Sequence, residues 1–239
     1  MSELEIIEVP DIISEIISDM KSSGTISSIA DNGDGTWKIT TTNTNNLEDN
    51  FKVEIDSNLY RVDNVTTKTF DITGSSLSGL ASETWEMYFK EEIGHRIEVA
   101  GKLSRIVKDK RGQERWDLIW LLTDNEEITP LEDNNNYAEV RIFIIIATGS
   151  TKDLSTQERL DQKFTPILSP IYRLMVRKLN DSKKLARNPG ERINPTKFNR
   201  YYYGVETEQG NEELILNTEA DAIEFTTTIK IKKQFINQC

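Results

Sequence analysis

A strand followed by an amphipathic helix, within residues 137–180, constrains the fold of this chain most strongly. Residues 140–148 form an almost continuous apolar run of strand length, which predicts a central position in a sheet. After a polar loop, apolar residues recur at steps of three or four and therefore share one helical face: Leu160, Phe164, Ile167, Ile171 and Leu174. No cluster of catalytic residue types lies in this stretch, which favours a structural or binding role.

The helical part of this stretch begins with a capping box and contains two prolines. Ser155 and Glu158 have the spacing at which the serine side chain accepts from the glutamate amide and the glutamate reaches back to the serine amide. Pro166 and Pro170 each remove a backbone donor, so we expect them to kink or split the helix. The second half, residues 171–179, is then the part that we expect a neighbouring molecule to contact.

Before this stretch, a short helix precedes a long β-rich segment. Pro10 suits the first turn of a helix, and Ile12, Ile13, Ile16, Ile17 and Met20 follow at helical spacing. From residue 24 to about residue 90, Thr, Ser, Asn and Asp dominate, and residues 31–35 carry a hairpin signal. The predicted strands of this segment are residues 25–30, 36–42, 51–55, 60–65, 69–73 and 85–89.

The remaining strand signals complete a mixed fold. Strands are predicted at residues 96–107 and, from an alternation of apolar residues, at 116–122. The signals at 197–204 and 213–216 are weaker. A last strand is predicted at 223–231, where alternate residues face the core. The order of elements predicts an α+β fold. We expect a mostly antiparallel sheet packed by an N-terminal helix and a long kinked helix, with an inserted β-hairpin or small β-domain. The predicted domains are an α+β core, residues 1–23 and 91–239, and an inserted β-rich domain, residues 24–90.

The composition excludes several classes of function. Cys239 is the single cysteine, so no disulfide forms within the chain and a cysteine metal site is disfavoured. His95 is the single histidine, and any Ser-His or Cys-His enzyme would have to use it. The net charge of −11 disfavours wrapping of nucleic acid by a basic face, although it is compatible with DNA that passes without binding. No apolar run approaches the length of a membrane span, and the acidic N-terminus does not resemble a signal peptide, so we expect a protein of the reducing cytoplasm.

Two short motifs have a ligand-binding interpretation and a structural one. Residues 149–152, Gly-Ser-Thr-Lys, follow a strand and precede a helix, where phosphate-binding loops occur. The second glycine that such a loop needs directly before the lysine is missing, so a connecting loop is favoured. Residues 31–35 are rich in oxygen ligands, but Gly33 occupies a position where a calcium loop needs a ligand, and a hairpin turn is favoured.

Charged and aromatic groups have similar alternatives. The acidic groups at Glu91 and Glu92, at residues 124–127 and at residues 206–208 are interpreted as solvated charges rather than as a metal or acid–base site. Lys183, Lys184 and Arg187 suit the end of a helix, or a partner's acidic surface. Residues 201–203, three tyrosines, are of the type enriched at interfaces, or they belong to the core of a strand.

Two passages resemble the small neck or tail-completion proteins of tailed bacteriophages, which include head–tail connector and tail-ring proteins. They are RIFIIIATGSTKDLSTQERLDQKFTPILSPIYRLMVRKL and LNTEADAIEFTTTIKIKK, and the likeness covers roughly residues 95–239. The segment FKVEIDSNLYRVDNVTTKTFDIT resembles virion proteins of phages of Bacteroidetes, including the crAss-like group. The resemblance implies a sheet that carries one long helix, subunits that close into a ring, and no catalytic residues. The inserted segment departs from the compact family pattern, which leaves neck, tail ring and tube as alternatives.

The sequence therefore predicts a non-enzymatic virion protein that forms a ring in the neck or tail and needs no cofactor or metal. Its expected partners are further copies of itself and neighbouring connector, portal-side or tail proteins, with DNA as passing cargo and no membrane. It would be assembled in the host cytoplasm. The predicted contact residues are Tyr60, Phe70, Trp85, Tyr201, Tyr202 and Tyr203. A monomeric β-rich module that binds a glycan or peptide, and an enzyme that uses a nucleotide at residues 149–152, remain as alternatives.

Overall fold

The chain folds into two compact units, each described by itself in this computed structural model. One unit contains Met1–Ser18 and Glu91–Cys239, and the other contains Asp19–Lys90. The second unit begins five residues earlier than the insert predicted from sequence, residues 24–90. The structure describes residues 9–74, 77–94, 99, 117–122, 129–130, 137–149, 154–186, 193–199, 203–206, 212–216 and 220–232.

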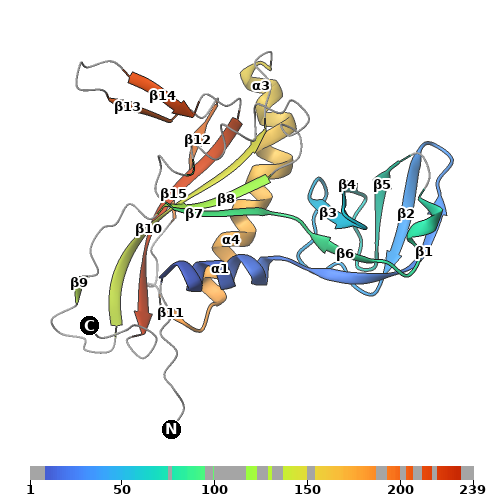
Figure 1. Ribbon diagram of the computed structural model, residues 1–239, viewed down its shortest axis with the longest axis horizontal. Coiled ribbons are helices and arrows are strands. Elements are labelled where there is room, and N and C mark those ends of the chain that lie inside the picture. The colour runs from blue at the N-terminus through green and yellow to red at the C-terminus, as the bar shows by residue number, and fades with distance from the viewer. Residues whose placement is uncertain are drawn as a thin grey trace, which may run out of the picture. The chain divides into compact units, whose positions relative to one another are not determined.

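The smaller unit is a closed barrel of six short antiparallel strands (Figure 1). The strands are β1 (Ser23–Asp31), β2 (Thr36–Thr41), β3 (Lys52–Ile55), β4 (Asn58–Asp63), β5 (Thr69–Thr73) and β6 (Thr84–Met87), with a 3₁₀ turn, η1, at Ser78–Leu80. Their order around the barrel is β1-β2-β5-β4-β3-β6, and β6 returns to pair with β1. Closure leaves no sheet edge open to unwanted pairing. The sequence predicted a small β-domain here but did not specify that its strands close into a barrel.

An aromatic pair fills the barrel. The rings of Phe70 and Trp85 meet edge to face, with centroids 5.4 Å apart. The indole of Trp85 donates a hydrogen bond to Thr41 Oγ1 over 2.6 Å, so its polar atom is satisfied inside the core. Aliphatic side chains from all six strands complete this core: Ile26, Ile39, Val53, Ile55, Val62, Ile72 and Met87.

The hairpin predicted at residues 31–35 is confirmed. β1 and β2 pair antiparallel on either side of it. Gly33 and Gly35 adopt φ of 82° and 85°, values that favour glycine. Asp31 Oδ1 accepts a hydrogen bond of 2.7 Å from the amide of Gly33, which closes the turn on itself.

The larger unit is built on a mostly antiparallel sheet, as predicted, in which β10 and β15 are the long strands. Its order is β11-β15-β10-β8-β7, with β12 paired to β15 and β9 paired to β10. Strands β13 and β14 form a separate two-stranded ribbon. The bounds are β7 (Lys90–Gly94), β8 (Asp117–Leu122), β9 (Thr129–Pro130), β10 (Tyr137–Gly149), β11 (Leu185–Ala186), β12 (Thr196–Phe198), β13 (Tyr203–Glu206), β14 (Glu212–Leu216) and β15 (Ala220–Lys232).

The centre of this sheet is buried on both faces. β10 lies between β8 and β15, which confirms the central position predicted from its apolar run. All six residues of β8 are buried, so its predicted alternation does not separate a core face from a solvent face. On β15 the predicted alternation is confirmed, because Ile223, Phe225, Thr227, Ile229 and Ile231 are buried and the residues between them are partly exposed. The strand predicted at residues 96–107 lies outside the described residues, apart from residue 99.

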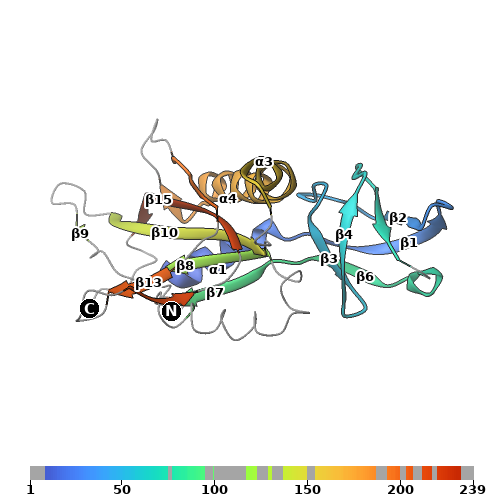
Figure 2. The same ribbon diagram turned by 90° about the horizontal axis from the view of Figure 1, so that it is seen from above.

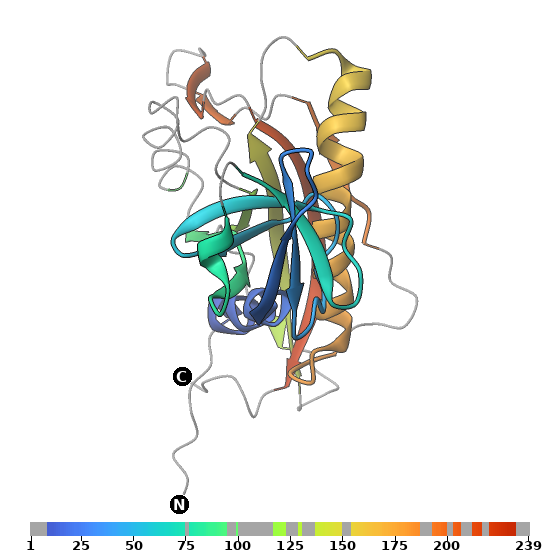
Figure 3. The same cartoon turned by 90° about the vertical axis from the view of Figure 1, so that its right-hand side faces the viewer.

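The helix that follows β10 is continuous but changes its hydrogen-bond pattern. It consists of α3 (Thr156–Arg159), a π-helical segment η2 (Leu160–Leu168) and α4 (Ser169–Asp181). Pro166 lies inside the π-helical segment and Pro170 in the first turn of α4, so the predicted irregularity takes the form of a wider helix rather than a break. Figures 2 and 3 show this helix running along β10 and β15, and Tyr172 packs edge to face on Phe225, with ring centroids 5.2 Å apart.

The wider helix alters the predicted apolar face. Leu160 is 37% exposed, and the neighbouring Arg159 is buried in its place, because π-helical bonds join residues five apart and shift the face by one position. Within residues 171–179, which we expect to contact a neighbouring molecule, the apolar side chains pack inward and only residues between them, such as Arg173 and Arg177, are exposed. Ile171, Leu174, Met175 and Leu179 are buried within the chain's own fold.

The N-terminal helix is confirmed as α1 (Val9–Met20). All five apolar residues that predicted it are buried: Ile12, Ile13, Ile16, Ile17 and Met20. In the larger unit, Glu15 of this helix forms an ion pair with Lys184, just beyond α4. No helix in the described part of the chain is long and apolar enough to cross a membrane.

Candidate functional site

Three polar residues lie in register across three strands of the larger unit. Thr148 on β10 pairs directly with Asp117 on β8 and with Asp221 on β15. Directly paired residues of adjacent strands present their side chains on the same face of a sheet. All three are buried, with side-chain exposures of 2% or less. Two carboxylates and a hydroxyl are therefore held together inside an otherwise apolar layer.

Arg159 on α3 supplies the positive charge for this group. Its Nη1 donates to Asp221 Oδ1 over 2.7 Å, and its Nε donates to the carbonyl of Leu154 over 3.0 Å. Thr148 Oγ1 donates to Asp117 Oδ1 over 2.7 Å. We call these four residues, Asp117, Thr148, Arg159 and Asp221, the buried polar network.

The network is closed to solvent. Arg159 is 2% exposed and Asp221 is 0% exposed, so a substrate has no path to their polar atoms. A buried ion pair of this kind is better at specifying one arrangement than at adding stability. Here the charge pair joins the first turn of the long helix to β15 and thereby sets where the helix lies along the sheet.

Sequence reasoning missed this network. The only local signal is an aspartate within, or at the start of, each of two apolar strands, together with an arginine beside the predicted helix face. None of these residues is unusual alone, and their convergence depends on strand register and on the π-helical segment.

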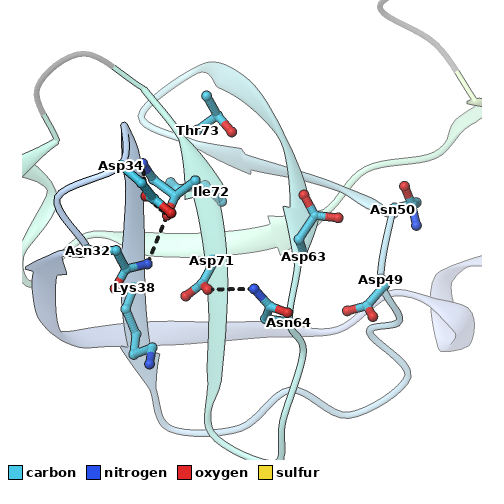
Figure 4. A pocket seen from close by; sticks show the side chains of 11 residues that line it. Asn32, Asp34, Lys38, Asp49, Asn50, Asp63, Asn64, Asp71, Ile72 and Thr73 are labelled. Atoms are coloured by element: carbon cyan, nitrogen blue, oxygen red, sulfur yellow. Dashed lines mark hydrogen bonds between the residues drawn. The ribbon is translucent and has the colours of Figure 1, made fainter.

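The outer surface of the barrel carries an exposed polar concavity. It is a depression of about 520 Å³ over β2, β4 and β5 and the loops beside them (Figure 4). The residues lining it are almost all polar: Asn32, Asp34, Thr36, Lys38, Asp49, Asn50, Asp63, Asn64, Asp71, Ile72 and Thr73. We call this feature the acidic depression.

Local hydrogen bonds engage several carboxylates of the acidic depression. Asp34 Oδ1 accepts from the hydroxyl of Thr36 over 2.5 Å and from its amide over 2.9 Å, and these bonds lower the pKa of Asp34 below its ordinary value. Asp49 Oδ1 accepts from the amide of Val65 over 2.7 Å. Asp71 Oδ2 accepts from the side-chain amide of Asn64 over 2.9 Å.

Two of the predicted contact residues lie in a core rather than on a surface. Phe70 and Trp85 are 0% exposed and form the barrel core, so these two side chains cannot reach a neighbouring molecule. Tyr60 lies half-buried on β4, opposite Val53. Tyr203 begins β13, and Tyr201 and Tyr202 lie outside the described residues. From the sequence pattern alone, an aromatic residue in a short β-strand can belong to an interface or to a core. Only the closure of the barrel shows that Phe70 and Trp85 belong to its core.

The other sequence candidates are placed as follows. Glu91 and Glu92 lie on β7, and Glu206 ends β13. His95, Arg187 and residues 124–127, 150–152 and 208 lie outside the described part of the chain. Within the described residues, no three carboxylate, histidine or cysteine side chains come together in a group that could hold a metal ion.

Comparison with known proteins adds no relative: no protein-family model, curated protein or solved structure matches this chain.

Proposed function

We propose that this chain is a structural virion protein that forms a ring in the neck or tail of a tailed phage and acts by oligomeric assembly. The observation that carries the proposal is the closed state of the buried polar network. Catalytic sites lie in accessible concave pockets. The charged cluster inside the larger unit is instead inaccessible and joins a helix to a sheet, which is a scaffolding role.

The architecture of the two units fits the same proposal. A sheet with a long helix resembles the subunit core expected for neck and tail-completion proteins, and the barrel is a second compact unit on the same chain. Ring closure multiplies weak contacts between identical subunits, so no single strong interface is needed. The net charge of −11 would let DNA pass through a ring without binding to it. Its partners would be further copies and the adjoining connector, portal-side or tail proteins of the virion.

A second candidate is a monomeric binding module. The acidic depression favours it, because this exposed concave surface is formed entirely by residues of the barrel. Such a module would recognise its ligand without self-association.

Sedimentation velocity and native mass spectrometry of the purified chain over a wide concentration range test the proposal. We expect a discrete higher oligomer at high concentration, and closed rings of one size in negative-stain images. Because connector subunits can require their partner, the same measurement is repeated with added candidate connector, portal-side and tail proteins. A sharp monomer in both series, together with absence of the chain from purified particles, would favour the binding module instead.

A further inference from the structure

The acidic depression contains a repulsive arrangement of charges on its floor. Asp63 on β4 lies directly opposite Asp71 on β5. Like charges in directly opposed positions destabilise a sheet. Lys38 on β2 lies opposite Asp71 on the other side, and Figure 4 shows Asp71 between Lys38 and Asn64. Four aspartates and one lysine line the depression, so its charge is strongly negative.

One carboxylate oxygen in the depression has no partner. Asp71 is 7% exposed, and its Oδ1 is buried and accepts no hydrogen bond from the described residues, the opposing Lys38 included. Leaving a buried charged oxygen unsatisfied is costly. The other oxygen of Asp71 is bonded to Asn64, and the carboxylates of Asp34 and Asp49 are bonded to the barrel's own turns. Asp71, the side chain with unmet bonding capacity, lines the depression beside the exposed Asp63.

The chemistry of the lining narrows the possible occupant to an organic cation. The described residues contain no metal-binding group of carboxylates, and about 520 Å³ is far larger than one ion needs. The lining residues include no aromatic side chain on which a sugar ring could stack. A guanidinium presents five donors in a plane and can bond to separate carboxylate and amide oxygens at once, and an ammonium presents three.

We propose that the acidic depression is a docking site for a basic side chain, arginine or lysine, of a protein partner. In it, the cation would bond to Asp63 and Asp71 and relieve their mutual repulsion, with the amide oxygens of Asn32 and Asn50 at the rim. This inference deepens the proposed function and rests on it for the source of the cation, because a neighbouring subunit would supply the side chain. The site itself can be tested without any ring.

The barrel contains a matched control for this test. Glu54 on β3 lies directly opposite Glu86 on β6, and both are exposed. The double variants D63N/D71N and E54Q/E86Q therefore remove the same two charges, from opposed strand positions, at two places on one barrel. The single variant D63N changes only an exposed residue. It replaces the double variant in the test if D71N disturbs the turn at Asn64.

The experiment is an NMR titration of the ¹⁵N-labelled full chain with a hexa-arginine peptide, with a hexa-glutamine peptide as the neutral probe. We expect shifts at the amides lining the acidic depression with the first peptide and none with the second. D63N/D71N should weaken binding about tenfold or more, since bonds between charged groups are worth that much, and D63N alone should weaken it several-fold. E54Q/E86Q should change binding by less than about twofold, as exposed charges contribute little.

Four results would overturn the docking site. The first is that the amide chemical-shift changes centre outside the acidic depression, and the second is that the two double variants weaken peptide binding equally. The third is that the hexa-glutamine peptide binds as well as hexa-arginine. The fourth is that calcium chloride, but not hexa-arginine, shifts the amides of the depression. The oligomeric state is read separately by sedimentation. Rings without peptide binding would overturn the docking site and leave the proposed function standing. Peptide binding at the depression by a chain that stays monomeric would support the docking site and contradict the ring.

Discussion

Removing one member of the buried ion pair should destabilise the larger unit severely. Asp221 Oδ1 lies 2.7 Å from Arg159 Nη1, and neither side chain is exposed by more than 2%. In Arg159→Met, which keeps an unbranched apolar stem but removes the charged guanidinium, the carboxylate of Asp221 stays buried without the charge of Arg159. Breaking a buried pair in this way costs about 3–5 kcal/mol. That is a large part of the about 5–15 kcal/mol by which a native domain is stable.

This loss should appear in one unit only. For a unit of this size, about 1 kcal/mol shifts the melting temperature by about 2–4 °C, so we expect a decrease of roughly 6–20 °C. Because two units can unfold separately, a single transition is not assumed. Fluorotryptophan NMR during thermal unfolding distinguishes them, since Trp120 lies on β8 of the sheet and Trp85 in the barrel core. The resonance of Trp85 should melt at the wild-type temperature.

A double variant tests the reasoning behind the magnitude. Arg159→Met combined with Asp221→Leu removes both charges of the pair, so neither is left buried without the other, and apolar packing replaces the pair. We expect it to be more stable than Arg159→Met alone, because the orphaned carboxylate causes most of the loss. A single variant that loses less than about 1 kcal/mol, or a double variant whose loss equals the sum of the two single losses, would refute the assignment of the network as a coupled, buried pair.

Three further changes probe local features. Ser155→Ala should cost about 1 kcal/mol by removing the cap of α3. Hydrogen bonds from the side chain and the amide of Ser155 lower the pKa of Glu158, so the stability that these bonds add is present above the ordinary glutamate pKa and is lost as pH falls through the lowered one. Acid melts of the variant should show a weaker dependence of this kind, because only the amide of residue 155 still donates to Glu158. Gly24→Ala should destabilise the barrel by about 1–3 kcal/mol in urea unfolding, since a Cβ there would lie 2.8 Å from Trp85 Nε1; an unchanged midpoint would contradict the close packing. Asp63→Asn should raise barrel stability by about 0.2–1 kcal/mol in the same assay by relieving its repulsion with Asp71, and a decrease would show that Asp63 has a stabilising structural role.

Much of the fold could be predicted because its signals are local. The spacing of isoleucines in α1, the glycines of the 31–35 turn, the apolar run of β10 and the Ser155–Glu158 cap each depend on residues close in sequence, and each is confirmed. The predictions that needed correction depend on longer-range packing. Leu160 is exposed because a π-helical segment shifts the buried face.

The sequence by itself therefore determined α1, β10, β15, the 31–35 turn and the α+β class, since hydrophobic period and turn chemistry are properties of short segments. Only the tertiary structure decided that β1–β6 close into a barrel, which turned Phe70 and Trp85 from predicted contact residues into core. It likewise brought Asp117, Thr148 and Asp221 into one row, and Asp63 opposite Asp71. Both groupings depend on strand register, which arises from pairing between distant segments and leaves no pattern within any one of them.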